Sequence, residues 1–526
     1  MFRFFLLSLL ALPLPLLAAP PAAPANFTVT STRPTMVTLA WQDNSADETG
    51  FEILRRTGMS GPFTSIGLLA ANTITAVNNN VMPQTTYQYQ IRSYKNPGPE
   101  VSVLADSNVV NTPAYLVLPA LLGPVISGTA PSSQVSTAGS LPLALPVGGV
   151  FSDPDVSSAA RLATDFGNID FVFLPTAAPL TVTNFLNYLN RGDFNNCLFH
   201  RSVPGLFLQA GGFRADATAS AIPTNPPILN EPLISNTRGT VAMAKRDNSP
   251  NSATNQFFIN LANNAGFLNA QNSGFSVFAR VAGSGMTVAD AIAALPVQDY
   301  TGVNGALAAT PYRIPPATPY NVGNLVRILT ATPISPLTLS VASSSPEIAS
   351  AMVNSGNLIL TAISPGVSTI TLTATDLDGL TGTTSFSFTV GPMDYQSWSD
   401  QQGFVSAAEA LPGADPDQDG RSNLLEFTLA SPPLASSAAD LLPSISSGKL
   451  TLRFPLRLHT SGVNVFLESN ESLQGPWTVR WATADGFPHP WISSVAPIGN
   501  VQFITAQNPD GANLPRQFLR LRVTKP

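Results

Sequence analysis

Residues 252–260 read Ser-Ala-Thr-Asn-Gln-Phe-Phe-Ile-Asn, and this stretch decides how the middle of the chain folds. Its second half, Gln256–Ile259, is a short apolar run, which predicts a buried β-strand. Similar runs on both sides predict further strands within the segment 157–330. These strands are Gly167–Phe173, Val203–Gln209, Gly239–Ala244 and Phe275–Val281.

Two amphipathic helices are predicted in the same segment. The first follows Pro179, a favourable residue for the first turn of a helix. Apolar side chains then recur at helical spacing, at Val182, Phe185, Leu186 and Leu189 and again at Val288, Ile292 and Leu295. We therefore expect residues 157–330 to form a closed β-barrel with two helices outside it.

Five ordered blocks of this segment resemble the cyclophilin family of peptidyl-prolyl cis-trans isomerases. The blocks are Phe199-His200-Arg201, then Pro204-Gly205 with Gln209 and Gly211-Gly212, then Arg238–Ala244, Ser252–Asn260 and Phe275–Val281. Five blocks in order are more specific than any single short motif. The resemblance covers the whole segment 157–330 and implies a barrel that isomerises X–Pro peptide bonds in proline-containing polypeptides.

The resemblance also implies where the reaction would take place. Rotation about an X–Pro bond needs no nucleophile, metal or cofactor, but it needs a site that binds the twisted amide better than the planar forms. The implied catalytic residues are Arg201, which would donate to the proline nitrogen, and Gln209, which would hold the neighbouring carbonyl. The implied substrate-binding residues are Leu206, Phe207, Met243, Phe258 and Leu268 around the proline ring, Ala244, Lys245 and Gln256 beside the preceding residues, and Phe267 and Phe275.

Several positions depart from the usual family pattern. Leu206 and Phe207 stand where the family usually has Phe and Met, so the pocket volume is roughly conserved. Phe267 replaces the Trp of cyclosporin-sensitive members and lacks its N–H donor, so weak cyclosporin binding is expected. Phe275 replaces a frequent His, and Ala210 replaces a Gly that could shape the local backbone.

His200 and Cys197 could each be given a chemical role, but a structural role is expected for both. His200 lies next to Arg201 and could be read as a general base, yet the reaction needs no proton transfer. Cys197 is the single cysteine of the chain, so no intramolecular disulfide can form. We expect a packed histidine and a small buried thiol.

Length and charge limit the other possibilities. A chain of 526 residues predicts several domains. The formal net charge of −6 and the absence of a Lys/Arg run argue against a dedicated nucleic-acid-binding protein. We therefore expect no nucleic acid among the partners.

The N-terminus has the pattern of a bacterial export signal. Arg3 precedes an apolar run from Phe4 to Leu17, too short to span a membrane, and Ala23-Pro24-Ala25 offers a cleavage site. Residues 1–25 are therefore predicted to be a signal peptide, with an N-terminal anchor as the alternative. After cleavage no membrane span is expected, because no later apolar run is long enough. The protein would be periplasmic, on the cell surface or secreted.

Short alternating strands flank the barrel segment. Residues 26–113 resemble a fibronectin type III domain, with Trp41 on an early strand and Tyr87 at a Pro-x-Thr-x-Tyr corner. Residues 125–156 and 337–391 together resemble one cadherin-like or bacterial immunoglobulin-like sandwich, into which the barrel would be inserted. The alternative is two linkers around a complete small sandwich.

Residues 415–426 read Asp-Pro-Asp-Gln-Asp-Gly-Arg-Ser-Asn-Leu-Leu-Glu and fit the twelve-residue calcium-loop template in every position. The expected ligands of a structural Ca²⁺ ion are Asp415, Asp417, Asp419, the Arg421 carbonyl, Asn423 and Glu426. The alternative is an acidic loop that only caps a helix predicted over Ser422–Leu429. The segment 392–432 resembles single loops of dockerin-like and thrombospondin-type repeats, and residues 440–526 are predicted to form a C-terminal β domain.

The sequence thus predicts a mainly β, multidomain protein. It carries a cyclophilin-like barrel, flanking β-sandwiches and a C-terminal β domain. The leading hypothesis is an exported peptidyl-prolyl isomerase. The alternative is a non-catalytic peptide-binding or adhesive cell-surface protein that uses the same fold.

Overall fold

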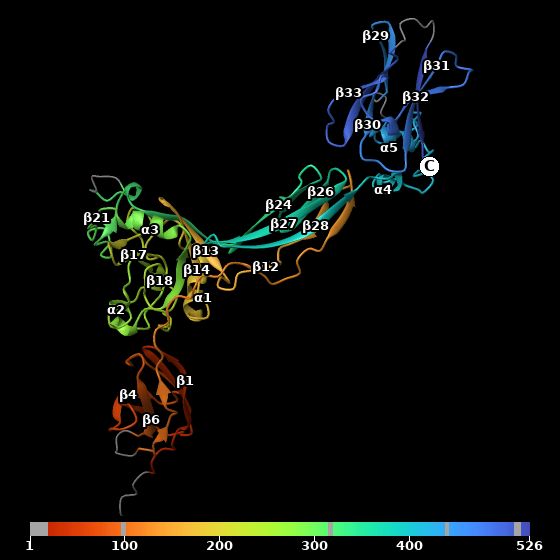
Figure 1. Ribbon diagram of the computed structural model, residues 1–526. Coiled ribbons are helices and arrows are strands. Elements are labelled where there is room, and N and C mark those ends of the chain that lie inside the picture. Colours follow the sequence, from red (N-terminus) through yellow and green to blue (C-terminus); the bar gives the residue numbers. More distant parts are fainter. Residues whose placement is uncertain (1–18, 96–100, 314–318, 437–440, 510–516) are drawn as a thin grey trace, which may run out of the picture. The chain divides into compact units, whose positions relative to one another are not determined.

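The computed structural model describes residues 19–95, 101–313, 319–436, 441–509 and 517–526 (Figure 1). The chain is mainly β, as predicted from its sequence. It divides into two compact units, of which the first comprises Met1–Leu121 and Asp155–Pro336 and the second comprises Leu122–Pro154 and Leu337–Pro526.

The middle of the first unit is a nine-stranded sheet that closes into a barrel. Its strands, in spatial order, are β15 (Cys197–Leu198), β23 (Arg327–Ile334), β13 (Ala159–Thr164), β14 (Gly167–Phe173), β20 (Val277–Ala282), β18 (Thr240–Met243), β19 (Phe257–Asn260), β17 (Phe207–Ala210) and β16 (Arg201–Val203). Only residues 199 and 200 separate the two end strands, β15 and β16, so the sheet must curl until its ends meet. This confirms the expected barrel.

The two predicted amphipathic helices are present as α1 (Pro179–Asn190) and α3 (Gly285–Ala293). Each sends its apolar face into the barrel core, α1 through Phe185 and α3 through Ile292. The Phe185 ring lies 5.0 Å from that of Phe278 on β20, measured between centroids. The described residues of this part also form five shorter elements, namely α2 (Ala265–Leu268), η1 (Gln271–Ser273), β21 (Val297–Gln298), β22 (Thr310–Pro311) and η2 (Val322–Asn324).

The single strand predicted over Val203–Gln209 is wrong. This stretch belongs to a hairpin, in which β16 and β17 are antiparallel and Arg201, Ser202 and Val203 face Gln209, Leu208 and Phe207. Gly205 in the connecting turn has a φ of +76°, a conformation that favours glycine. Pro204-Gly205 is therefore a turn rather than the interior of a strand.

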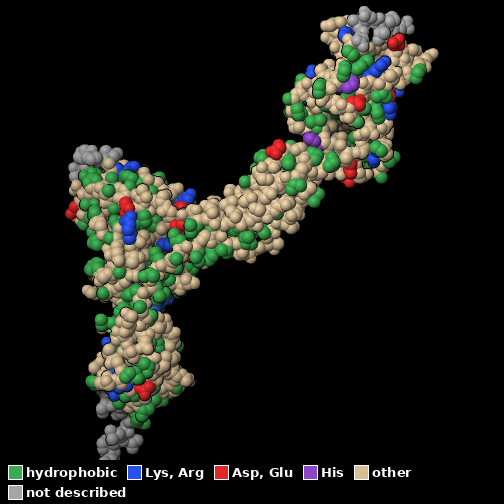
Figure 2. All heavy atoms as spheres, viewed as in Figure 1, with side chains coloured by type: hydrophobic (Ala, Val, Ile, Leu, Met, Phe, Trp, Pro, Cys, Tyr) green, Lys and Arg blue, Asp and Glu red, His purple; other side chains and the backbone are tan. Residues whose placement is uncertain are grey.

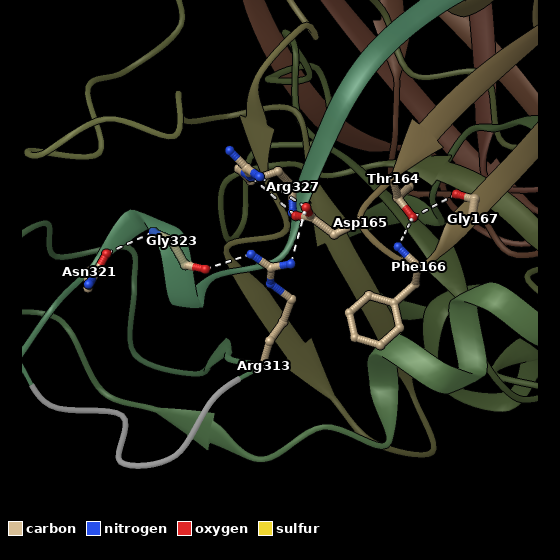
Figure 3. A network of polar contacts seen from close by, with 8 residues as sticks. All are labelled: Thr164, Asp165, Phe166, Gly167, Arg313, Asn321, Gly323 and Arg327. Carbon is tan, nitrogen blue, oxygen red and sulfur yellow. Dashed lines mark hydrogen bonds and ion pairs between the residues drawn. The ribbon is translucent and has the colours of Figure 1, made fainter.

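A buried carboxylate fixes one end of the barrel (Figure 3). Asp165, in the β13–β14 turn, accepts hydrogen bonds from the Arg327 backbone N–H at 2.8 Å and from its Nη2 at 3.0 Å. Arg313 lies 3.3 Å from the same carboxylate and donates from its other Nη to the Gly323 carbonyl at 2.6 Å. Asp165 therefore joins the turn, strand β23 and the connection that precedes β23.

Residues 25–112 form two small sheets in the first unit. One contains β1 (Ala25–Arg33), β2 (Met36–Gln42) and β5 (Thr75–Asn78), and the other contains β4 (Thr64–Ala70), β3 (Gly50–Thr57), β6 (Thr86–Tyr94), β7 (Ala105–Asp106) and β8 (Val110–Asn111). Trp41 and Tyr87 are buried, and the Met82 backbone N–H donates to the Tyr87 hydroxyl at 2.9 Å. The assignment to the fibronectin type III family stays a prediction.

The predicted signal peptide lies only partly within the described residues. Its residues 1–18 are outside the part of the chain that the structure describes. The described part already contacts the first domain, since the Ser93 hydroxyl donates to the Ala22 carbonyl at 2.6 Å. Cleavage after Ala25 would remove this contact.

In the second unit, strands from both sides of the barrel segment pair with one another. Strand β10 (Gln134–Thr137) is parallel to β28 (Thr381–Gly391), which continues to β27 (Gly366–Asp376) and β24 (Leu337–Ser343). A second sheet holds β11 (Leu143–Pro146), β26 (Asn357–Ala362) and β25 (Ala349–Asn354), and β9 (Val125–Ile126) pairs with β12 (Phe151–Ser152). One apolar core includes Val150 from the first segment and Phe388 from the second. The division into inserted barrel and split sandwich stays a prediction.

The remaining described residues of the second unit contain two short helices and the strands of the predicted C-terminal β domain, whose status as a separate domain stays a prediction. The helices are α4 (Tyr395–Ser399) and α5 (Asn423–Leu429). One sheet contains β29 (Leu442–Ser446), β30 (Lys449–Arg457), β34 (Val501–Gln507) and β33 (Ile492–Ser494), the other contains β32 (Thr478–Ala482), β31 (Asn464–Asn470) and β35 (Phe518–Thr524), and η3 (Thr483–Asp485) follows β32. Trp481 and Ile504 lie in the shared core, to which α5 adds Leu429.

Candidate active site

The β16–β17 hairpin places Arg201 and Gln209 opposite each other. Directly opposed residues of an antiparallel pair project from the same face of the sheet. The guanidinium carbon of Arg201 lies 5.0 Å from the centroid of the Phe207 ring. Within the described part of the chain, no carboxylate lies within ion-pair distance of Arg201, so its charge is not committed to a neighbour.

A cavity of about 280 Å³ opens beside these side chains. Phe258 contacts two other aromatic residues of the lining. Its ring centroid lies 5.5 Å from that of Phe207 and 5.6 Å from that of Phe275. The cavity thus combines an apolar wall with a cation and an amide. Its lining comprises Arg201, Phe207, Gln209, Ala244, Lys245, Asp247, Phe258, Phe267, Leu268, Gln271 and Phe275.

A second hollow of about 260 Å³ shares Gln209, Ala244 and Lys245 with the first. Gln256 lies in this hollow, and its Oε1 accepts a hydrogen bond of 2.8 Å from the Gln209 amide. Gln209 therefore stands between the two hollows with its amide group held in place. An extended chain could cross this shared wall and enter both.

Most of the residues implied by the sequence resemblance meet in these two hollows, but two do not. Met243 is completely buried in the barrel core, and Leu206 is 40% exposed in the hairpin turn, and neither lines the cavity. Asp247 and Gln271 do line it and were not expected. Asp247 lies in a turn and Gln271 begins the three-residue helix η1, and neither stretch is long enough for a periodic pattern to indicate which way a side chain points.

Lys245 links two walls of the cavity. Its Nζ donates to the carbonyls of Asn272, at 2.8 Å, and of Gly274, and lies 4.6 Å from the centroid of the Phe275 ring. These contacts tie the end of β18 to the connection that contains η1. Burial lowers the pKa of the Lys245 ammonium to about 7.

His200 and the glycines after Ala210 have structural roles. Burial lowers the pKa of His200 to about 4, so the imidazole is neutral near pH 7.

Ala210 lies in the regular ladder of β17 opposite Phe257. Gly211, in contrast, has a φ of +91°, and a Cβ there would lie 2.4 Å from the Asn255 carbonyl oxygen. The backbone therefore needs a glycine at position 211, whereas position 210 accepts an alanine.

The six predicted calcium ligands lie in the second unit, in and beside the connection that leads into α5. Carboxylate oxygens of Asp415, Asp417 and Asp419 come within 4.8 Å of one another. Glu426 and Asn423 are on α5 and are completely buried. Arg421 lies between these two groups in the sequence.

The distribution of charged side chains and the length of the helices bear on possible partners. On the face drawn in Figure 2, Lys and Arg side chains are scattered among uncharged ones rather than gathered into one basic patch. None of the helices that the structure describes has both the length and the apolarity needed to cross a lipid bilayer.

Comparison with known proteins identifies relatives of the barrel segment. Residues 159–309 match the family model described as cyclophilin type peptidyl-prolyl cis-trans isomerase/CLD. Peptidyl-prolyl cis-trans isomerase A of Dickeya dadantii is 44% identical over 139 residues, which are 26% of this chain and 71% of that protein. Peptidyl-prolyl cis-trans isomerase B of Escherichia coli is 45% identical over 136 residues, 24% of this chain and 80% of that protein. A solved cyclophilin type isomerase from Cryptosporidium parvum aligns over 34% of this chain and 98% of its own, with 18% identity and a TM-score of 0.26.

Proposed function

Because this chain belongs to the cyclophilin-type peptidyl-prolyl cis-trans isomerase family, we propose that its barrel isomerises X–Pro bonds of exported proteins with the help of Arg201. The isomerase class follows from membership of the family. The proposal adds the mechanism, the residues and the class of client.

The chemical task is rotation about a partial double bond. The barrier is ~18–20 kcal/mol, because rotation removes the amide resonance. Without a catalyst, the change takes tens to hundreds of seconds. In the twisted state the proline nitrogen becomes pyramidal and can accept a hydrogen bond. In the planar amide the same nitrogen is a poor acceptor. A donor placed at that nitrogen therefore stabilises the transition state more than either ground state.

Arg201 is suited to be this donor. A guanidinium stays charged at any working pH and presents several N–H groups in a fixed plane. It lies over the Phe207 ring, 5.0 Å from the ring centroid, and both residues line the cavity. This juxtaposition of a cation that no described carboxylate pairs with and a cavity with an aromatic wall is the observation that carries the proposal.

The remaining contacts divide between the two hollows. The aromatic wall of Phe207, Phe258 and Phe275 would hold the proline ring. Gln209 would hold the carbonyl before proline, since its amide is fixed by Gln256 at 2.8 Å. The preceding residues would lie in the second hollow. One side of the bond is thus held while the other turns.

A proline-limited refolding reaction tests this proposal with the full chain. The wild-type protein is expected to accelerate it, Arg201→Ala to remove most of the acceleration, and Arg191→Ala to keep it. Arg191 is a suitable control because it pairs with Asp193 at 2.7 Å, away from the cavity. Equal rates for wild type and Arg201→Ala would contradict the role of Arg201. Peptide binding without any acceleration by the wild type would instead support a non-catalytic binding protein.

Export is supported by the sequence of the N-terminus, where Arg3 precedes a short apolar run. The clients would then be exported polypeptides. N-terminal sequencing of the protein from its own cells tests this part separately. A mature chain that begins at Asn26 is expected, and a chain that keeps Met1 would contradict export by this route.

A further inference from the structure

The connection between α4 and α5 gathers carboxylates of like charge. Carboxylate oxygens of Asp415, Asp417 and Asp419 lie within 4.8 Å of one another. At this separation the charges repel one another, and burial in protein strengthens the repulsion. A cluster of acidic residues is not sufficient evidence for a metal site, so the surrounding buried groups must be considered.

Glu426, in the first turn of α5, is the strongest additional evidence. Its side chain is 0% exposed, and neither carboxylate oxygen has a hydrogen-bond partner. A buried carboxylate without a partner is costly. Glu426 also does not cap α5, because its oxygens accept no backbone N–H. The helix-capping alternative therefore does not explain its burial.

Asn423 offers a second unused oxygen. Its amide nitrogen donates to the carbonyls of Glu409, at 2.6 Å, and Leu411, at 3.0 Å. Both donors of the amide group are thereby used, so the orientation of the side chain is fixed. Its Oδ1 is completely buried and has no hydrogen-bond partner. Two buried residues of α5 thus have side-chain oxygens that accept no hydrogen bond from the described part of the protein.

We propose that residues 415–426 bind one Ca²⁺ ion, which joins the acidic loop to the buried oxygens of α5. The oxygens would come from the side chains of Asp415, Asp417, Asp419, Asn423 and Glu426 and from the Arg421 carbonyl. Oxygen ligands in this number and with this charge suit Ca²⁺, whereas Mg²⁺ demands a tighter octahedron and retains its waters. Gly420, with a φ of +86°, gives the loop its sharp turn.

The ion would stabilise more than its own loop. Phe427, next to Glu426, packs against Trp398 of α4 with ring centroids 5.4 Å apart. The Phe427 carbonyl accepts a hydrogen bond of 2.7 Å from Nε of Arg457 on β30. Leu429 enters the core of the C-terminal β domain. Holding α5 in place should therefore raise the melting temperature of the unit that contains this domain.

The test uses the full chain, freed of metal with a chelator and titrated with calcium chloride. Calorimetric titration is expected to show one Ca²⁺ per chain, and calorimetric unfolding should show a higher melting temperature with calcium than with the same concentration of magnesium. Glu426→Gln should weaken calcium binding by more than ~100-fold, because even residues that only support metal ligands contribute ~10–100-fold. Without metal, this variant should melt no lower than the wild type, since a buried charge has been removed.

Asp400→Asn is the matched control. It removes one negative charge from the exposed end of α4, outside the loop, and should keep the wild-type affinity. Should Glu426→Gln fail to fold, Asp417→Asn replaces it, because one Asp417 oxygen is also without a hydrogen-bond partner. A wild-type protein that shows neither binding heat nor a melting shift at ~1 mM calcium would overturn the proposal. Wild-type affinity in both loop variants would also overturn it.

Discussion

Arg201 and Gln209 are cross-strand partners in the β16–β17 hairpin, and Gln209 is in turn held by Gln256 at 2.8 Å. The hairpin thus fixes the distance between the cation and the amide that the proposed mechanism uses. Because the turn at Pro204-Gly205 sets this pairing, a shift of one residue would place the two side chains on opposite faces of the sheet. The catalytic geometry therefore depends on the turn as well as on the two residues.

The hydrogen bond between Gln209 and Gln256 gives the first prediction. Gln256→Leu leaves Gln209 without its acceptor and should lower kcat/KM by up to ~10-fold, the value of one typical hydrogen bond. Gln209→Leu should cost at least as much, because the proposed substrate contact is lost as well. The double variant should lose less than the sum of the two single losses, since the two amides share one hydrogen bond. Strictly additive losses in an X–Pro peptide assay would argue that the two amides act independently.

The single cysteine provides a local probe of barrel stability. Cys197 is completely buried in the barrel core, and burial raises the pKa of its thiol to about 12. A thiol reagent should therefore label the chain only when the barrel unfolds. Labelling in increasing urea then follows the barrel separately from the other domains.

Asp165 gives a prediction that this probe can check. Asp165→Asn should lower the free energy of unfolding of the barrel by ~1.5–3 kcal/mol, because the charge-assisted hydrogen bonds that its buried carboxylate accepts from Arg327, and its ion pair with Arg313, are weakened. Asp170→Asn is the control, since the partner of Asp170, Arg161, is 42% exposed and such a pair contributes ~0–1 kcal/mol. Equal losses in the two variants would mean that the Asp165 network is no stronger than a surface pair.

Lys245 predicts a dependence of stability on pH. Its folded-state pKa, about 7, lies below the ordinary value of 10.5, so between these values the unfolded chain binds the extra proton. Stability should therefore rise with pH across this window and be lowest below pH 7. One pKa unit corresponds to ~1.4 kcal/mol, so the gain should be at least that large.

The measurement is Cys197 labelling in urea at several pH values. Lys245→Met should remove the rise in stability between pH 7 and 10, whereas Arg246→Met, which removes a neighbouring exposed charge, should keep it. A wild-type stability that stays level or falls over this range would show that the two carbonyls and the Phe275 ring outweigh burial and keep the ammonium charged.

Sequence reasoning predicted the barrel well because its signals are local and repeated. The predicted run Gln256–Ile259 overlaps β19, and the helical spacing of Phe185 and Leu189 occurs in α1. The β16–β17 hairpin was missed because Leu206 and Phe207 follow Pro204-Gly205 without a break in apolar character. The Pro204-Gly205 dipeptide is itself a turn signal that could have identified the hairpin.

The site was predicted less completely than the fold, for a related reason. Met243 ends a strand, and its side chain is taken up by the barrel core, so the resemblance to the family did not show its orientation. Asp247 and Gln271 come to the cavity from irregular connections, whose paths depend on contacts such as that between Lys245 and the Asn272 carbonyl. Such tertiary contacts are not encoded in the spacing of residues.

The central claim is that the Arg201 guanidinium stabilises the twisted amide rather than the bound peptide. Measuring both kcat/KM for an X–Pro peptide and the Kd of the same peptide for wild type and Arg201→Ala tests it most directly. We predict a fall in kcat/KM of ~10²–10³-fold, typical of a lost transition-state donor, with Kd nearly unchanged. A Kd that weakens in parallel with kcat/KM, or a kcat/KM that stays at the wild-type value, would contradict it.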